Sequence, residues 1–366
     1  MEKSKVYFTD MRTSYEENLQ DKLRRMIDTA GMGNIDFNGK FVAIKIHFGE
    51  PGNLAYLRPN YARVLVEYIQ ERGGLVFLTD CNTLYVGRRR NGLEHITSAY
   101  ENGYTPFSTN CHVIIADGIK GTDEALIDVD GELVQQAKIG RAIADADIII
   151  SLSHFKGHVE AGFGGAIKNI GMGSGSRAGK LDVHCDGKPG VDQDACVGCG
   201  LCAKNCAHDA ISYVDGKADI DIDKCVGCCR CLGVCPTDAI SSRWSNASEQ
   251  LNKKMVEYTM AVVKDKPSFH VSLAIDISPG CDCEDANDMP VVGDVGMFAS
   301  FDPVALDAAC VAAVNAMPSE PRSVVGKKVD KGDYFTMIHP ESDWKVQIAH
   351  GKKMGLGNDE YELVKI

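Results

Sequence analysis

Eight of the fifteen cysteines in this 366-residue sequence repeat one spacing in two adjacent stretches. Each stretch reads Cys-x2-Cys-x2-Cys-x3-Cys; the first begins at Cys196 and the second begins 29 residues later at Cys225. Both stretches continue to the same Asp-Ala-Ile-Ser sequence, so the similarity extends beyond the cysteines. Three thiolates at this spacing bind one face of an iron–sulfur cube, while the fourth is carried toward a second cube. The repeat therefore predicts two 4Fe-4S clusters.

The expected ligation is crossed between the two copies. One cluster takes Cys196, Cys199, Cys202 and Cys235, and the other takes Cys225, Cys228, Cys231 and Cys206. Gly198 and Gly227 stand where the backbone must wrap closely around the sulfurs. Tetrahedral zinc is the alternative, but it needs four cysteines per site and not a three-plus-one crossing repeat. The additional Cys229 is expected to be a small buried residue rather than a spare ligand.

Residues 187–242, called here the cysteine-rich segment, resemble the dicluster bacterial ferredoxins. The resemblance implies low-potential, one-electron transfer. Pro236 follows the fourth cysteine of the second copy, as in those ferredoxins, whereas Ala207 replaces this proline in the first copy. The segment carries eight acidic and five basic residues, so a redox partner protein with a basic docking patch is expected.

A glycine-rich stretch with several polar side chains precedes this segment. It runs from Ser153 to Ser176, directly after an apolar run that ends at Leu152, and it predicts a strand, a loop and the start of a helix. Ligands of open α/β sheets bind at the carboxyl ends of strands, where such a loop exposes N–H groups to a polar or anionic ligand. Its glycines fit neither the dinucleotide fingerprint nor the Walker phosphate loop. A tight glycine turn packed against its sheet is the alternative.

We expect a pocket at these strand ends. The catalytic candidates are His158, Lys168 and His184: Lys168, at a desolvated helix start, is expected to have a lowered pKa, and the imidazoles could ligate a metal or relay protons. The candidates for binding a cofactor, an additional metal or a small-molecule ligand are His154, Gly164, Gly165, Asn169, Lys45, His47, Cys281 and Cys283.

Two pairs of these candidates, and one further run of residues, have open alternatives. Cys281 and Cys283 form a further metal or redox-active site if Pro279-Gly280 turns the chain, and are otherwise coincidental loop cysteines. A strand with one solvated face explains Lys45 and His47 equally well. The run at residues 88–90, three consecutive arginines, is interpreted as a solvated turn, with an anion clamp as the alternative.

Two family resemblances concern the same residues. Nearly the whole chain resembles a family of uncharacterised iron–sulfur-centre proteins, domain of unknown function 362 with an inserted dicluster ferredoxin domain, through motifs such as Ser153-His-Phe-Lys-Gly-His158 and Ser278-Pro-Gly-Cys-Asp-Cys283. More distantly, the segment from His158 to Lys168 is similar to the glycine-rich motif of the nickel-pincer lactate racemase family. That similarity implies that the lysine anchors a cofactor and that His158 and His184 move protons or hold a metal. Residues 79–90 contain no counterpart of that family's other catalytic histidine.

The elements that must position these residues alternate on both sides of the cysteine-rich segment. Strands are expected at residues 41–48, 75–78, 112–116, 146–152, 270–276 and 346–349. Helices are expected at residues 14–30, 59–73, 134–146, 248–264 and 303–316, the last with Asp302 as N-cap and Pro303 at its first position. This pattern predicts an α/β fold, Rossmann-like with largely parallel sheets and flanking helices, interrupted by a small ferredoxin-like α+β dicluster domain.

The same alternation resumes after the cysteine-rich segment, so we expect an insertion into one α/β domain. The first part of that domain covers residues 1–186, the inserted 2×(4Fe-4S) domain covers 187–242, and the second part covers 243–366. Cys185 and Trp244 are expected close to the two junctions.

Composition limits the class of protein. With 44% hydrophobic and 25% charged residues it is typical of globular proteins, and no apolar run approaches the ~20 residues of a membrane helix. A net charge of −12 argues against nucleic acid or an anionic membrane as partner. The start lacks an apolar signal-peptide stretch and the cysteine count is odd, so a cytoplasmic protein with reduced thiols is expected.

Taken together, these features predict an iron–sulfur oxidoreductase. In it, the two 4Fe-4S clusters pass electrons to or from a pocket of the α/β domain that binds a small polar or anionic substrate. The alternative is a ferredoxin-type electron carrier or redox module that docks on a partner enzyme and has no catalytic site of its own; a third class is an iron–sulfur redox sensor. Convergence of the polar candidates in one concave pocket favours the enzyme, and their dispersion favours the carrier.

Overall fold

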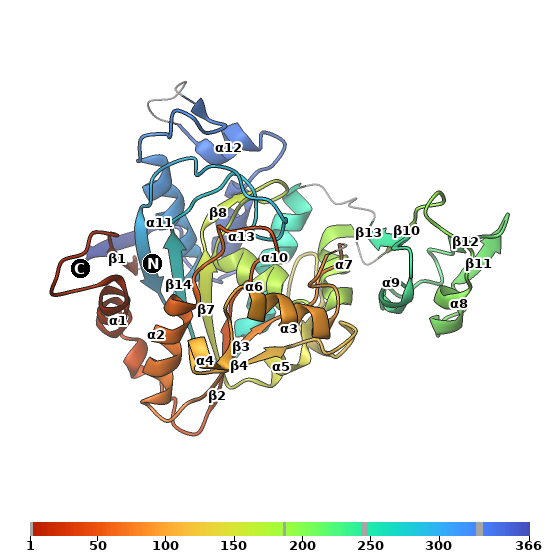
Figure 1. The fold of residues 1–366 in the computed structure, drawn as a ribbon, viewed down its shortest axis with the longest axis horizontal. Helices are drawn as coiled ribbons and strands as arrows, with labels where there is room; N and C mark the ends of the chain where they lie inside the picture. Colours follow the sequence, from red (N-terminus) through yellow and green to blue (C-terminus); the bar gives the residue numbers. More distant parts are fainter. Residues whose placement is uncertain (1–2, 86, 186–187, 243–247, 327–331) are drawn as a thin grey trace.

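The structure, a computed structural model, describes residues 3–85, 87–185, 188–242, 248–326 and 332–366 (Figure 1). Trp244, expected near one junction, lies outside the described residues, and so does the side chain of Cys185. Among the helices of these described ranges, none combines the length and apolar character needed to cross a membrane.

An eight-stranded sheet forms the centre of the main body, in the order β16-β1-β15-β14-β7-β2-β3-β4. Its strands are β1 (Ser4–Thr9), β2 (Phe41–Lys45), β3 (Leu75–Asp80), β4 (His112–Ile115), β7 (Ile148–His154), β14 (Ser268–Ala274), β15 (Gly296–Ser300) and β16 (Tyr361–Lys365). Only β15 pairs antiparallel with its neighbours in this sheet, and the other pairs are parallel. The predicted α/β fold with a largely parallel sheet is therefore confirmed.

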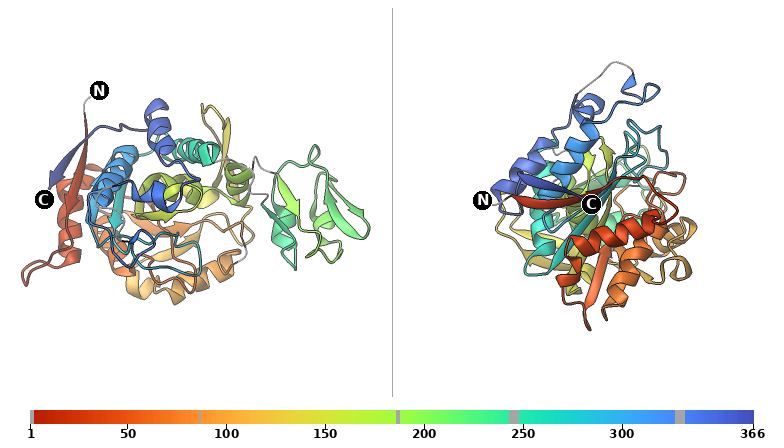
Figure 2. Two further views of the ribbon diagram at one scale, coloured as in Figure 1. Left: turned by 90° about the horizontal axis from the view of Figure 1, so that it is seen from above. Right: turned by 90° about the vertical axis from the view of Figure 1, so that its left-hand side faces the viewer.

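Helices cover both faces of this sheet (Figures 1 and 2). The longer ones are α1 (Leu19–Thr29), α2 (Pro59–Gln70), α3 (Gly92–Glu101), α6 (Ala166–Ser174), α7 (Arg177–Cys185), α10 (Ser248–Val263), α11 (Pro303–Asn315) and α13 (Lys345–Lys353). Shorter ones are α4 (Pro106–Thr109), α5 (Arg141–Asp145) and α12 (Tyr334–Ile338). As expected, Asp302 caps α11, because its carboxylate accepts from the amides of Val304 and Ala305, each at 2.9 Å.

The order of the strands creates a switch point between β2 and β7. From β2 the chain moves through β3 to β4 in one direction, and from β7 it moves through β14 to β15 in the other. A crevice therefore opens where the crossovers part, outside the carboxyl ends of β2 and β7, which is where open α/β sheets bind ligands.

Two expected elements are different in the structure. Residues 134–146 are not one helix: β6 (Gln136–Gly140) pairs antiparallel with β5 (Glu124–Asp128), and only α5 follows. The connection between these strands is held by Glu257 of α10, whose carboxylate accepts from the amides of residues 132–134, so a long-range contact outweighs the helical pattern. Residues 346–349 are not a strand but part of α13, which buries Gln347, Ile348 and His350 at helical spacing; four residues of alternation were too few to distinguish the two.

The glycine-rich stretch forms more structure than a loop. After β7 it makes a hairpin of β8 (Lys156–His158) and β9 (Gly162–Gly164), and then enters α6. Close packing explains several of its glycines, since a Cβ on Gly171 would lie 2.0 Å from the carbonyl oxygen of Met255 in α10. The alternative of packed glycines thus holds for this part of the stretch.

The cysteine-rich segment stands outside the eight-stranded sheet, beside α7 (Figures 1 and 2). It contains β10 (Pro189–Val191), α8 (Leu201–Asn205), β11 (Ile211–Val214), β12 (Lys217–Ile220), α9 (Arg230–Val234) and β13 (Ile240–Ser242). β10 pairs with β13, and β11 pairs with β12, both antiparallel. Gly200 and Cys229, at equivalent positions of the two copies, precede α8 and α9 and both have a left-handed backbone with φ of 83° and 58°.

Candidate functional site

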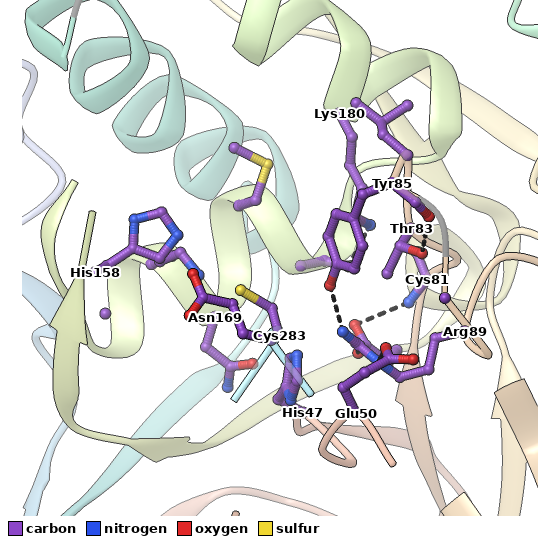
Figure 3. Close-up of a pocket in the computed structure, with 18 of the residues that line it drawn as sticks. His47, Glu50, Cys81, Thr83, Tyr85, Arg89, His158, Asn169, Lys180 and Cys283 are labelled. Atoms are coloured by element: carbon purple, nitrogen blue, oxygen red, sulfur yellow. Dashed lines mark hydrogen bonds and ion pairs between the residues drawn. The ribbon is translucent and has the colours of Figure 1, made fainter. Parts of the chain in front are cut away.

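A cavity of about 720 Å³ opens at the carboxyl ends of β2, β3 and β7 (Figure 3). Its wall contains ten of the eleven candidates expected outside the cysteine repeat: His158, Lys168, His184, His154, Gly164, Gly165, Asn169, Lys45, His47 and Cys283. The eleventh, Cys281, is buried, and its sulfur lies 3.3 Å from the Lys168 Nζ in that wall. Residues more than 200 positions apart in the sequence thus meet in one concave site, as when His47 and Cys283 line the same cavity.

Several of these side chains reach the cavity from the end of a helix or strand. β2 ends at Lys45, β3 at Asp80 and β7 at His154, so parallel strands bring three polar side chains to one edge of the sheet. The first turn of α6 is held by Asp307 of α11, whose carboxylate accepts from the amides of Ala166 at 2.7 Å and Ile167 at 3.0 Å. This contact fixes the helix that carries Lys168 and Asn169.

Two histidines present an N–H group to the cavity. The Nδ1 atom of His47 accepts from the Gly49 amide at 3.0 Å, and that of His158 accepts from the amides of Glu160 and Ala161 at 3.2 and 3.1 Å. Burial lowers the pKa of both rings well below the ordinary value, so both are neutral at pH 7. A neutral ring that accepts at Nδ1 carries its proton on Nε2. The buried His47 Nε2 has no partner among the described residues.

His154 has a structural role instead. Its Nδ1 faces the Asp282 carboxylate at 2.9 Å and its Nε2 faces the carbonyl oxygen of Ile275 at 2.7 Å, so neither nitrogen is left for a ligand. Lys156 also pairs with Asp282, at 3.2 Å. Burial would raise the pKa of Asp282, but these two neighbours lower it below its usual range. The carboxylate therefore fixes the loop on which Cys281 and Cys283 stand.

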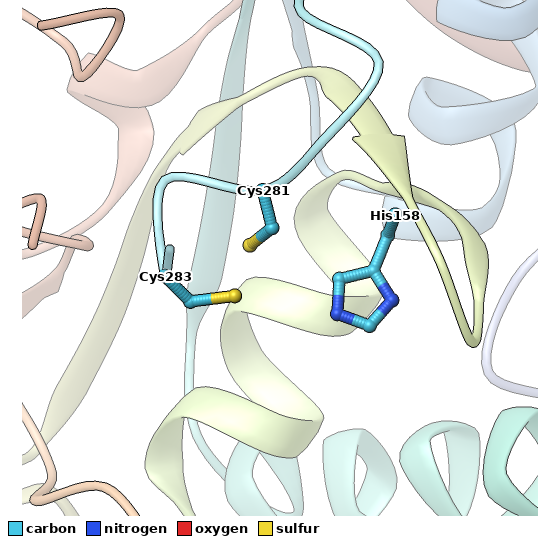
Figure 4. Close-up of side chains that lie close together, drawn as sticks. All are labelled: His158, Cys281 and Cys283. Carbon is cyan, nitrogen blue, oxygen red and sulfur yellow. The ribbon is translucent and has the colours of Figure 1, made fainter. Parts of the chain in front are cut away.

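Two cysteine sulfurs and one histidine nitrogen lie close together at the cavity wall, next to Lys168. Among the residues that the structure describes, His158, Cys281 and Cys283 have ligand atoms that all lie within 4.8 Å of one another, a spacing that could hold a metal ion (Figure 4). A hydrogen bond from the Cys283 thiol, followed by the Lys168 ammonium, holds the pKa of Cys281 well below its usual value. Burial would lower the pKa of Lys168, but the two cysteines beside it raise it. The expected lowering of the Lys168 pKa is therefore wrong, because Cys281, 3.3 Å from Lys168 Nζ, and Cys283 favour the charged ammonium.

Asn169 and Lys45 connect elements around the cavity. The Asn169 amide donates to the carbonyl oxygens of Lys45 and Leu152 at 3.0 and 3.2 Å, and to Ser153 Oγ at 3.0 Å. Lys45 Nζ in turn donates to Asn169 Oδ1 at 2.9 Å and pairs with Asp80 at 2.9 Å. These groups tie α6 to the ends of β2 and β7, and the Asn169 amide is already fully engaged.

A buried network that was not predicted from the sequence lies on the side of the cavity away from His158 (Figure 3). Arg89 Nε donates to Glu50 at 2.7 Å, its guanidinium also contacts the Tyr85 hydroxyl, and Asp80 lies 3.7 Å away (Figure 3). A solvated turn is therefore wrong for Arg89, which is 1% exposed. The sequence did contain a signal for this network, because Glu50 and Asp80 each stand two residues after the end of a predicted strand, where site residues collect.

The eight repeated cysteines gather around two small cavities in the cysteine-rich segment. Cys196, Cys199, Cys202 and Cys235 line one of them, and Cys206, Cys225, Cys228 and Cys231 line the other. The extra Cys229 is buried, and its thiol faces the carbonyl oxygen of Arg177 in α7 at 3.5 Å.

Helix α7 lies between the large cavity and the cysteine-rich segment. Lys180 and His184 on one side of it line the large cavity. On its other side, Ala178 and Leu181 belong to the same apolar cluster as the buried cysteines of the cysteine-rich segment, Cys196, Cys202, Cys229 and Cys231. One helix therefore contacts both regions.

Comparisons with known proteins add a family. Residues 42–312 match the family model described as domain of unknown function (DUF362). A curated protein, the thylakoid-associated protein sll1697 of Synechocystis sp., is 26% identical over 162 residues, which cover 43% of this chain and 47% of that protein. The chain thus matches less than half of that relative's length.

Two solved structures have weak similarity to the fold. The lactate racemase apoprotein of Thermoanaerobacterium thermosaccharolyticum aligns with a TM-score of 0.38 and 14% identity over 75% of this chain and 51% of that one. A protein from Thermotoga maritima aligns with a TM-score of 0.40 and 11% identity over 84% of this chain and 60% of that one.

Proposed function

The chain belongs to the DUF362 family, whose domain has no described function, and we propose on the basis of its own site that it is an iron–sulfur oxidoreductase. The cysteine-rich segment would hold two 4Fe-4S clusters, which supply or accept single electrons when bound. The large cavity would bind the substrate. The observation that carries the proposal is the division of the eight cysteines into two sets of four that each line one cavity.

The composition of these sets supports clusters over zinc ions. Each set combines three cysteines of one copy with the fourth cysteine of the other, as the crossed ligation requires. Four thiolates around one zinc ion, with Zn–S bonds of about 2.3 Å, lie about 3.8 Å from one another. Within the described part of the chain, no three of these eight sulfurs lie within 4.8 Å of one another. A larger inorganic group suits this spacing better than a single ion.

Hydrogen bonds to the sulfurs support the same assignment. The amides of Ala218 and Ala210 donate to Cys196 Sγ and Cys206 Sγ, each at 3.4 Å, and the Tyr213 hydroxyl lies 3.4 Å from Cys202 Sγ. Such contacts stabilise thiolate ligands and tune the reduction potential of a cluster.

The cavity favours a small substrate with a carboxylate or carbonyl oxygen. His47 and His158 carry Nε2–H groups, and Lys168 carries an ammonium group. Of the lining acids, Asp80 and Glu50 are already paired with cations, and Glu160 contacts His184 at 3.3 Å. The other two lining acids, Glu284 and Asp285, are exposed, so donors outnumber free acceptors only in the buried part of the wall. An oxygen anion would gain charge-assisted hydrogen bonds there.

The ferredoxin-type carrier remains the second candidate, and exposed apolar side chains favour a docking surface in either case. Val197 and Val226, at equivalent positions beside the two cysteine sets, are 65% and 52% exposed. With the acidic excess of this segment, they suit a redox partner protein with a basic docking patch.

The test is anaerobic reduction of the purified protein followed by addition of small oxo acids, hydroxy acids and aldehydes. If the protein is an oxidoreductase, some of these compounds restore the visible absorbance of the oxidised clusters, and Lys168→Met abolishes this reoxidation. Lys5→Met, a change at an exposed position of β1, serves as the matched control and leaves it unchanged. Reoxidation only by a partner protein, with no effect of Lys168→Met, would support the carrier instead.

A further inference from the structure

We propose that Cys281 and Cys283 form a reversible dithiol–disulfide pair, which is the two-electron group of the large cavity. The proposal deepens the function above and rests on it in one respect, because the two clusters are the source of the electrons. The proposal is based on the position of both thiols beside His158 at the cavity wall (Figure 4) and on the contact of Cys281 with Lys168.

The loop geometry directs both thiols to the same side. Asp282, between the two cysteines, turns away from them to His154 and Lys156, with contacts of 2.9 and 3.2 Å. The amide of Glu50 also donates to the carbonyl oxygen of Asp282 at 2.9 Å, so the backbone is held as well. With the central residue fixed, Cys281 and Cys283 both face His158 (Figure 4), and Cys281 contacts Lys168.

The surroundings fit a redox pair better than a metal ion. A histidine that ligates a metal through one nitrogen donates from its other nitrogen to an acceptor. His158 does the reverse, since its Nδ1 accepts from the amides of Glu160 and Ala161. Its other nitrogen, Nε2, then carries a proton and faces the thiols in Figure 4. The Lys168 ammonium, 3.3 Å from Cys281 Sγ, adds a positive charge where a metal cation would have to bind.

The redox step balances with the groups present. In reduction, the bond between the two Sγ atoms breaks, each of the two 4Fe-4S clusters would give one electron, and one proton is taken up at Cys283 Sγ, which leaves a thiol at Cys283 and a thiolate at Cys281 beside Lys168. Oxidation is the reverse, with two electrons returned to the clusters. The Lys168 ammonium, 3.3 Å from Cys281 Sγ, offsets the charge of that thiolate, and a ring nitrogen of His158 lies within 4.8 Å of both sulfurs.

The thiols of Cys281 and Cys283 differ in how accessible they are from the large cavity. Cys283 lines the cavity, while Cys281 is 2% exposed and contacts Lys168. Cys283 is therefore the sulfur that a substrate can reach. A ring closed by two cysteines only one residue apart is strained, and strained disulfides are the labile and catalytic ones.

The experiment equilibrates the holoprotein anaerobically with a series of dithiothreitol redox buffers, quenches it in acid, alkylates free thiols and analyses peptides by mass spectrometry. The peptide with Cys281 and Cys283 is expected to change from doubly alkylated to unalkylated and two hydrogen atoms lighter as the buffer becomes more oxidising. Cys281→Ser and Cys283→Ser each abolish this change. Cys111→Ala, at a buried thiol that donates to the carbonyl oxygen of Val76, is the control and preserves it.

A second variant separates a redox role from a structural one. The Lys168 ammonium stabilises the reduced pair through the Cys281 thiolate, so Lys168→Met should let the disulfide persist into more reducing buffers, and Lys168→Arg should restore the original midpoint. An unchanged midpoint in Lys168→Met contradicts the role given to the ammonium.

Two results would overturn the proposal. One is a pair of cysteines alkylated in every buffer although iron and sulfide are present. The other is a tightly bound metal ion that is lost in both Cys281→Ser and Cys283→Ser, which would make the site a metal centre. If instead the disulfide forms but the protein contains no iron or sulfide, the redox pair stands and the proposed function fails.

Discussion

Arg89 and Arg90 are consecutive in the chain, yet their side chains end in two different sites. Arg89 donates to Glu50 at 2.7 Å in the wall of the large cavity. Arg90 donates to the carbonyl oxygen of Leu232 at 2.6 Å and pairs with Asp238, both in the cysteine-rich segment. A movement of the backbone at Arg89 and Arg90 would therefore disturb the wall of the large cavity and the cysteine-rich segment together.

We expect Arg89→Ala and Arg90→Ala to have different effects. Arg89→Ala leaves Glu50 buried without its partner, which should lower the free energy of unfolding by roughly 3–5 kcal/mol. Arg90 and Asp238 are partly exposed, so Arg90→Ala should cost only about 0–1 kcal/mol. It should, however, speed amide hydrogen exchange in α9, because the segment loses an attachment.

Denaturant unfolding and hydrogen exchange measured on both variants test this difference. Arg88→Ala is the control, since Arg88 pairs with Glu101 at the surface. Equal stability losses in Arg89→Ala and Arg88→Ala would mean that the buried ion pair is not formed.

The prediction of two 4Fe-4S clusters has two parts, the iron and sulfide content of the protein and the crossed ligation by the two cysteine copies. Anaerobically prepared protein should contain about eight iron and eight sulfide per chain, the sum of two four-iron cubes. Cys235→Ser should damage the cluster that also uses Cys196, Cys199 and Cys202, and Cys206→Ser should damage the other. Electron paramagnetic resonance of the reduced variants distinguishes the two. Zinc without sulfide would contradict the assignment, and damage by Cys235→Ser to the other cluster alone would contradict the crossing.

Replacing the cysteine-rich segment by a short flexible linker should leave a folded protein without iron. The register of β10 and β13 sets Pro189 opposite Ser242, so the two ends of the segment lie side by side and a short linker can join them. The deletion uncovers Leu181 of α7, and burial of one leucine contributes roughly 1.5–3 kcal/mol. A lower melting temperature is therefore expected, and Leu181→Gln in the deletion variant should improve its solubility.

Circular dichroism and thermal unfolding provide the readout for that variant. Retained near-ultraviolet signal and a cooperative transition are expected. Complete loss of folding would show that the segment and the main body share one core.

Asp307 should make stability fall between acid and neutral pH. Burial raises the pKa of Asp307 to about 7, from an ordinary value of 3.8, although the amides of Ile167 and Ala166 partly offset this. The folded protein therefore binds a proton that the unfolded chain has released. This contribution to stability is fully present below the unfolded pKa and is lost as the pH rises through about 7.

The measurement is urea unfolding at about pH 5.5 and about pH 8.5, on either side of the folded pKa. Asp307→Asn has no proton to lose, so its stability should fall less between these two conditions than that of the unchanged protein. Asp288→Asn, at an exposed carboxylate, is the matched control. The same fall in Asp307→Asn as in the unchanged protein would contradict the prediction.

The sequence by itself determined the features that depend on short stretches of chain. Alternating apolar and amphipathic runs predicted the α/β fold, which the sheet confirms, because burial periodicity is a local property of each element. Asp302-Pro303 likewise predicted the start of α11 from two adjacent residues. Strands β1, β15 and β16 were not anticipated. β1 pairs with β15 and β16 from the opposite end of the chain, as when Tyr7 lies opposite Ala299 and Val364, although β15 also pairs with the nearby β14.

Tertiary structure alone decided the composition of the cavity. Lys168 and Cys281 are separated by 113 residues and meet only because the order of β7 and β14 in the sheet brings their connections together. The burial of Arg89, the anchoring of His154 by Asp282 and the pKa of Lys168 follow from such long-range contacts. Spacing along the chain carries no information about these partners, because the distance between two side chains is set by strand order and helix packing, and electrostatic effects depend on that distance and on burial.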